Sequence, residues 1–306
     1  MSSLAHQPPQ IARANGIDIC YEIFGDAGAE PMLLIMGLGA QMVLWDDEFC
    51  QQLAARGFRV IRFDNRDIGL STKFSGGKRL TVFELLRLRV FHFPIAAPYK
   101  LRDMAEDTIG LMDALGIASA HLVGASMGGM IAQEIAISFP QRVRSLTSIM
   151  STTGNPRLPP PSRQVAAMLM APPPKTKDEY LARFAKTWKM LRVGSFPEDE
   201  AFDRVRAETS FQRGLNPAGV GRQLRAILAS GSRKERLRSV TAPTLVIHGT
   251  VDPLVRPEGG KDTAASIPGA KLMMVEGMGH AVPIPMWPKI IGAIAEHAHG
   301  ASAKAA

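Results

Sequence analysis

Short apolar runs alternate with amphipathic stretches along most of this 306-residue chain. Runs of three to five mainly apolar residues, several ended by glycine or a polar turn, are typical of buried strands. Between them, apolar residues recur at helical spacing. The expected strands are residues 32–36, 59–63, 121–123, 146–150, 244–247 and 271–275, and the expected helices are 46–56, 103–115, 127–138 and 288–297. This alternation predicts an α/β protein with a mostly parallel sheet covered by helices.

The alternation stops between about residues 155 and 235, where prolines interrupt the chain at 156, 159–161 and 172–174. Residues 181–191 and 218–229 have helical patterns, and no run in this segment reads as a strand. We therefore expect a helical insertion (155–235) between two strands of one sheet, with residues 1–154 and 236–306 forming the core. Residues 299–306 are small and polar and are expected to fray.

The charge of the chain is concentrated in that insertion. The chain has 36 Lys and Arg against 28 Asp and Glu, a net charge of +8. Residues 151–240 alone hold 17 basic and 8 acidic residues, so this segment carries the whole excess. A basic segment can face nucleic acid or an anionic surface. No Arg/Lys block is interleaved with aromatic residues, so solvated helix faces are expected instead, and no nucleic-acid partner.

Other features of the composition narrow the class of protein. No window has the roughly 18 consecutive apolar residues of a membrane span, and the first residues have no basic cluster followed by an apolar stretch. Cys20 and Cys50 are the only cysteines, too few for a disulfide framework. These features predict a globular cytoplasmic protein that does not enter the membrane.

The segment 124–128 reads Gly-Ala-Ser-Met-Gly and fits the pattern G-x-S-x-G. In this motif a strand turns sharply into a helix with serine at the bend, and the flanking glycines avoid side-chain clashes. The expected strand before it and helix after it supply the required context. Ser126 is therefore a candidate nucleophile, placed where helix N–H groups point at the atom it would attack. A structural tight turn is the alternative.

A serine nucleophile needs a base and an acid, in the chain order Ser, Asp, His for this motif. Asp252 follows an expected strand in a turn with glycine and proline neighbours, whereas Asp262 lies within a helix and Glu276 is close to the base in sequence. His280 lies in a glycine-rich loop after the last strand and is the candidate base. The other histidines fall in expected tails (His6, His297, His299), in an unassigned segment (His92), in a strand (His121) or before the acid (His248).

Acyl transfer also needs N–H donors for the negative charge that develops on the carbonyl oxygen. The N–H of Met127, directly after the nucleophile, is one candidate. The other is the N–H of Leu38, in the loop after the first apolar run, because Gly37 lets the backbone come close. An ordinary glycine-rich strand exit is the alternative for that loop.

These residues resemble the α/β-hydrolase superfamily over nearly the whole chain, with the insertion at the position of the family's cap. Segments 36–37, 45–49, 63–71, 268–270 and 277–281 resemble more closely the subgroup that contains the aclacinomycin methylesterase. The family's usual His-Gly before the oxyanion residue is Met36-Gly37 here, as in that subgroup. The loop 67–69 reads Asp-Ile-Gly instead of the commoner Arg-Gly-x-Gly form, and the cap matches least.

The resemblance and the residues together predict a serine hydrolase that cleaves a small-molecule carboxylic ester, such as a methyl ester, through an acyl-enzyme. Neither a metal nor an organic cofactor is expected, and Met36, Gly37 and Met278 are expected to contact substrate. A basic cap would favour acidic or aromatic esters. Two alternatives remain open: an amide hydrolase of the proline-iminopeptidase kind, which would need an acidic recess, and a ligand-binding protein that has lost its chemistry.

Overall fold

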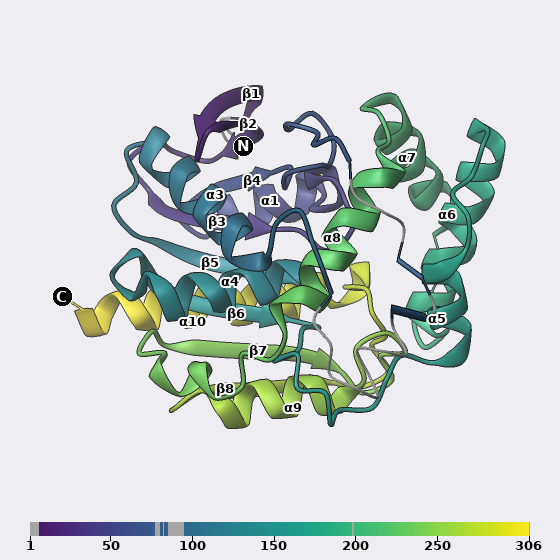
Figure 1. Cartoon of the computed structure of the whole chain (residues 1–306). Coiled ribbons are helices and arrows are strands. Elements are labelled where there is room, and N and C mark those ends of the chain that lie inside the picture. Colours follow the sequence, from purple (N-terminus) through teal and green to yellow (C-terminus); the bar gives the residue numbers. More distant parts are fainter. Residues whose placement is uncertain (1–5, 77–79, 82, 85–94, 198, 306) are drawn as a thin grey trace.

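A single sheet runs through the middle of the molecule (Figure 1). The computed structural model describes residues 6–76, 80–81, 83–84, 95–197 and 199–305, and within them eight strands pair in the order β1-β2-β4-β3-β5-β6-β7-β8. Their bounds are β1 His6–Ala14, β2 Ile17–Phe24, β3 Glu30–Ile35, β4 Phe58–Phe63, β5 Ala120–Ala125, β6 Val143–Ile149, β7 Thr244–Gly249 and β8 Lys271–Val275.

The sheet is mostly parallel, as the sequence predicts. Strands β1, β2 and β4 pair antiparallel, and every pair from β4 to β8 is parallel. The first two strands are not among the expected elements. Residues 6–10 of β1 are exposed and include two prolines, so they show no buried face in the sequence. His6 therefore lies in a strand, and its prediction as a tail residue is wrong.

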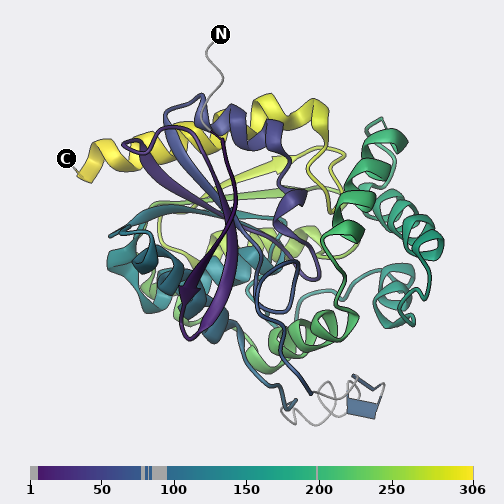
Figure 2. The ribbon, with the colours of Figure 1, turned by 90° about the horizontal axis from the view of Figure 1, so that it is seen from above.

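Helices cover both faces of the sheet, and the expected α/β class is confirmed (Figure 2). Helices α1 (Asp47–Ala54) and α10 (Trp287–Ala305) pack on one face. Helices α3 (Leu101–Ala114), α4 (Met127–Ser138) and α9 (Pro257–Ser266) pack on the other. Each face buries its own apolar cluster, because successive strand residues point to opposite sides. In β5, Leu122 belongs to one cluster and Val123 to the other.

The expected fraying of the C-terminus is wrong, since α10 continues to Ala305. Polar side chains on this last part bond to the core and hold it in place. His299 Nε2 lies 3.0 Å from the carbonyl oxygen of Arg56, and Ser302 Oγ donates to the Glu30 carboxylate. A local sequence pattern does not reveal such long-range contacts.

Among the described residues, four α-helices lie between β6 and β7 in the chain, beyond the carboxyl ends of the parallel strands (Figure 1). They are α5 (Arg163–Met170), α6 (Lys177–Arg192), α7 (Glu200–Gln212) and α8 (Pro217–Ser230). Each begins where a polar side chain accepts a hydrogen bond from a first-turn N–H. These capping residues are Ser162, Thr176, Asp199 and Asn216. We call residues 155–235 the cap segment; its status as a separate domain stays a prediction.

The basic residues of the cap segment are only partly on solvated helix faces. Arg222, Arg225 and Arg233 are less than 5% exposed, so the prediction of solvated faces is wrong for them. Arg222 forms a two-pronged ion pair with the fully buried Asp67, with N–O distances of 2.8 and 2.7 Å. Arg206 pairs similarly with Asp46. These two cap arginines are thus neutralised by carboxylates of the core.

Candidate active site

Ser126 lies at a strained turn between β5 and α4. Its backbone φ is +55° and ψ is −118°, a conformation that side chains rarely adopt. Glycine is required around it because the backbones touch. A Cβ at Gly124 would lie 2.3 Å from the carbonyl oxygen of Gly128, and one at Gly128 would lie 2.0 Å from that of Ile35. The spacing of glycines in the motif follows from these approaches.

The sheet brings the three side chains of the sequence hypothesis together. Ser126 follows β5, Asp252 follows β7 and His280 follows β8, so all three lie at the same edge of the parallel sheet. His280 Nε2 lies 3.0 Å from Ser126 Oγ, and His280 Nδ1 lies 2.7 Å from Asp252 Oδ2. Ser126, His280 and Asp252 therefore form one hydrogen-bonded series across 154 positions of the chain.

Asp252 is fully buried, and both of its carboxylate oxygens have partners. Oδ1 accepts hydrogen bonds from the backbone N–H groups of Leu254 and Val255, each at 2.9 Å. Oδ2 is left to face His280. Because a carboxylate oxygen accepts, His280 donates from Nδ1, and the lone pair on Nε2 then faces the Ser126 hydroxyl.

His248 lines this site from β7, in keeping with its expected role as a core or site-lining residue. Its Nε2 donates to the carbonyl oxygen of Val255 at 2.8 Å and lies 3.6 Å from Asp252 Oδ2. Burial lowers the pKa of His248 below its ordinary value, so the ring is neutral near pH 7. A neutral ring adds no positive charge that would compete with His280 for the Asp252 carboxylate.

The loop after β3 runs beside Ser126. A Cβ on Gly37 would lie 3.1 Å from the Ser126 Cβ, so glycine allows the close approach that the sequence suggested. Within the described ranges, the N–H groups of Leu38 and Met127 donate no hydrogen bond to the protein. Met127 is the first residue of α4, where the N–H has no partner in its own helix. Neither N–H group is therefore committed to an acceptor in the described part of the chain.

Two methionines expected to contact substrate are buried in the apolar cluster beneath α1 and α10. Met278 is fully buried and Met36 is 8% exposed. Their role in substrate binding stays a prediction.

The rejected histidines and carboxylates lie elsewhere. His121 is buried beside Ser145, and Asp262 bonds to Thr153 and Lys234. His297 and His299 lie in α10, not in a tail. His92 lies outside the described residues.

Comparison with known proteins identifies the family of the chain. The family model described as "alpha/beta hydrolase fold" matches residues 30–285. The chain belongs to the α/β-hydrolase fold family. Within that family it is similar to rhodomycin D methylesterase DauP of Streptomyces sp. (strain C5), at 29% identity over 96% of this chain and 99% of the relative. DnrP of Streptomyces peucetius, also named a rhodomycin D methylesterase, gives the same figures.

Solved structures of hydrolases share the fold. A meta-cleavage product hydrolase of Pseudomonas fluorescens, 21% identical, has a TM-score of 0.75 over 95% of this chain and 98% of its own. A hydrolase of Pseudomonas aeruginosa, 26% identical, has a TM-score of 0.71 with the same coverage. No helix among the described residues is long and apolar enough to cross a membrane.

Proposed function

We propose that this protein is a carboxylic-ester hydrolase in which Ser126 is the nucleophile, His280 the general base and Asp252 the residue that orients the base. The single observation that carries the proposal is the hydrogen-bonded series from Ser126 Oγ through His280 to Asp252, with distances of 3.0 and 2.7 Å. A serine hydroxyl becomes a competent nucleophile when a correctly oriented imidazole accepts its proton.

The proposed reaction has two halves. Ser126 Oγ attacks the ester carbonyl carbon while His280 Nε2 takes the hydroxyl proton, and the tetrahedral intermediate then collapses. The alcohol leaves with the proton from His280, and the acyl group stays on Ser126. Water, deprotonated by His280, attacks this acyl-enzyme and releases the carboxylic acid. Asp252 stabilises the imidazolium form of His280 in both halves.

In this proposal the N–H groups of Leu38 and Met127 stabilise the negative charge that develops on the ester carbonyl oxygen. Met127 directly follows Ser126, and Leu38 follows Gly37, whose backbone approaches Ser126. Neither N–H group is used by another bond within the described residues. In enzymes of this kind, loss of one such donor lowers kcat by about 10²- to 10³-fold. The positive end of α4 adds to the stabilisation.

Methyl esters are the substrate class we propose first. Two relatives that match over 96% of this chain are named rhodomycin D methylesterases. The cap segment lies over the edge of the sheet that carries Ser126 and would select the acyl part. Carbamate hydrolysis is the competing chemistry, because a putative carbamate hydrolase of Azorhizobium caulinodans is 29% identical over 88% of this chain.

The test is a comparison of matched substrates. We expect the wild-type protein to hydrolyse p-nitrophenyl esters and natural-product methyl esters, and Ser126→Ala to lose about 10⁴-fold or more of kcat. An amide and a carbamate with the same acyl group should react much more slowly. Faster turnover of the amide or carbamate would contradict the ester proposal. Full activity in Ser126→Ala would reject the nucleophile, and tight binding without turnover would identify a binding protein.

A further inference from the structure

The turn that carries Leu38 is bonded to the cap segment through one buried side chain. Gln223 of α8 is fully buried. Its Oε1 accepts a hydrogen bond of 2.9 Å from the backbone N–H of Gly39. Its Nε2 donates a hydrogen bond of 2.9 Å to the backbone carbonyl of Arg66, in the loop after β4. One amide thus links a cap helix to two loops of the core.

The hydrogen bond from Gly39 to Gln223 restricts the conformation of the turn at residues 37–40. The N–H of Ala40 donates to the carbonyl of Gly37, which closes a four-residue turn with Leu38 and Gly39 at its centre. Gly39 has a φ of +68°, the value that a type II turn requires at its third residue. Type I and type II turns differ by a rotation of the central peptide plane, and that plane contains the Gly39 N–H. A fixed acceptor for this N–H therefore holds the turn in one form.

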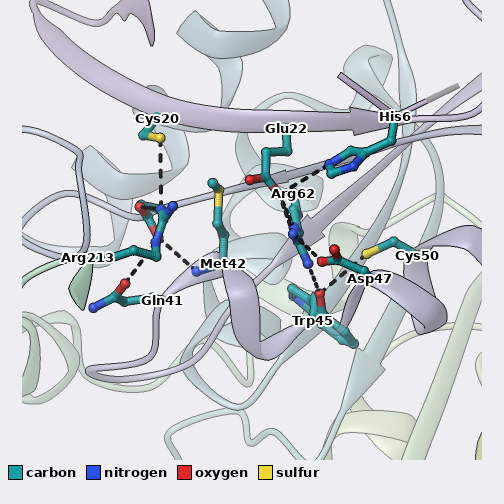
Figure 3. Close-up of polar contacts among 11 residues, drawn as sticks. His6, Cys20, Glu22, Gln41, Met42, Trp45, Asp47, Cys50, Arg62 and Arg213 are labelled. Atoms are coloured by element: carbon teal, nitrogen blue, oxygen red, sulfur yellow. Dashed lines mark hydrogen bonds and ion pairs between the residues drawn. The ribbon is translucent and has the colours of Figure 1, made fainter. Parts of the chain in front are cut away.

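Packing and further polar contacts reinforce the same link. A Cβ on Gly39 would lie 3.1 Å from a methyl carbon of Val220, so α8 rests directly on the turn. Two residues further on, Gln41 Nε2 donates to the carbonyls of Ser210 and Gly214, at 2.8 and 3.0 Å. Arg213 of the cap segment in turn donates to Gln41 Oε1 (Figure 3).

Asp64, in the loop after β4, bonds to the last part of the loop that follows β3. Its Oδ1 accepts from the backbone N–H of Met42 at 2.8 Å, and its Oδ2 is paired with Arg213. Figure 3 shows Arg213 beside Gln41, with the hydrogen bond between them. At the start of the loop, Asn65 Nδ2 donates to the carbonyl of Met36 at 2.9 Å. The loop is thus held by the core at its two ends and by the cap between them.

From these contacts we infer that Gln223 is a positioning residue for the oxyanion site. Through Gly39 it fixes the turn that presents the Leu38 N–H, so the docking of cap helix α8 sets how well a tetrahedral intermediate is stabilised. The inference rests on the proposed function, because it needs Leu38 to be an oxyanion donor. Gln223 does not act on substrate itself. A substrate that moves α8 would change kcat by the same route.

The test replaces Gln223 with methionine, which is similar in length and makes neither hydrogen bond. Gln223→Met is expected to lower kcat by about 10- to 100-fold, within the cost of losing one oxyanion donor, and to change KM by less than about threefold. Affinity for a phenylboronic acid, which forms a tetrahedral adduct with the serine, should fall by the same factor as kcat. Affinity for the carboxylate product should stay unchanged.

A matched control comes from the last residue of the same helix. Ser230 Oγ also accepts from a core backbone N–H, that of Leu101 at 2.9 Å. Ser230→Ala should lower the melting temperature and leave kcat and the boronic acid affinity unchanged. If Gln223→Met does not fold, Gln223→Leu serves in its place, since it also removes both hydrogen bonds. It should lower kcat by about 10- to 100-fold, and a wild-type kcat would overturn the inference.

The outcomes separate this inference from the proposed function. If Ser126→Ala is inactive while Gln223→Met keeps the wild-type kcat and boronic acid affinity, only the role of Gln223 is overturned. A different result is that Gln223→Met and Ser230→Ala lose kcat equally, in proportion to their losses of melting temperature. That result would show that Gln223 has only a structural role and would also overturn the inference. Full activity in Ser126→Ala would overturn the proposed function instead.

Discussion

Asp252 determines which nitrogen of His280 carries the proton. Its Oδ1 is already held by the N–H groups of Leu254 and Val255, so Oδ2 alone faces the imidazole. This leaves the base with one tautomer and one orientation. The sequence identified Asp252 and His280 from chain order and loop composition, but it gave no sign of the two N–H donors that fix the carboxylate.

Asp252→Asn tests this orientation. The amide has the shape of the carboxylate, so we expect the fold to persist and the melting temperature to change little. Its NH₂ group could face His280 Nδ1 and favour the wrong tautomer, which should lower kcat by about 10⁴-fold. Ester hydrolysis and circular dichroism measured on the same sample would check both parts. A loss below about tenfold would show that the tautomer is set by another group.

His121 makes stability depend on pH. Burial lowers its pKa to about 4, and Glu30 opposes this shift while Arg144 and His297 favour it. An unfolded histidine has a pKa near 6.5, so the unfolded state binds more protons below that pH. Unfolding is therefore favoured as the pH falls from about 6.5 toward 4.

We expect the free energy of unfolding to fall by about 2 kcal/mol between pH 7 and pH 5 through His121 alone. His121→Asn removes the titrating group and should flatten this part of the profile. Urea denaturation at several pH values measures the slope in both proteins. Equal slopes in the variant and the wild type would contradict the assignment.

At the scale of elements, the cap helices are attached to the core by buried ion pairs. Asp67 is fully buried and receives hydrogen bonds from Arg222, Tyr99 and Asn216. Tyr99 lies just before α3, and the other two residues belong to the start and middle of α8. This carboxylate therefore joins the loop after β4 to a cap helix.

Arg222→Met should destabilise the protein by about 3–5 kcal/mol, because it leaves Asp67 charged and buried without its cation. The double variant Arg222→Met/Asp67→Asn removes the charge as well and should recover part of that loss. Chemical denaturation of the two variants and the wild type measures the difference. A loss below about 1 kcal/mol for Arg222→Met would show that the pair contributes little to cap attachment.

Most elements with a clear apolar pattern were predicted, although β2 was missed despite its apolar run. Helix α4 and strand β8 have the expected bounds, since an uninterrupted apolar pattern ends at a proline or glycine turn. The first residues of strand β1 have no buried face, so the sequence there shows no alternation of apolar and polar residues. Helices α5 and α7 are short or weakly amphipathic, so only their capping residues mark them in the sequence.

At the scale of the whole molecule, the site is assembled from loops at one edge of the sheet. Parallel strands place their carboxyl ends together, which is why residues far apart in sequence could be predicted to meet. The contacts between cap and core could not be predicted in this way. Gln223 and Gly39, or Arg222 and Asp67, are paired only by the docking of α8, and a local pattern does not show which helix face turns to the core.

The central claim is that Ser126 is the nucleophile activated by His280. A fluorophosphonate reacts with an activated serine, forming an Oγ–P bond and releasing fluoride. Intact-mass and peptide mass spectrometry should find one adduct, on Ser126, in the wild type. Ser126→Ala should give none, and His280→Gln should react far more slowly. An adduct on a different residue, or a His280→Gln variant that reacts at the wild-type rate, would contradict the account.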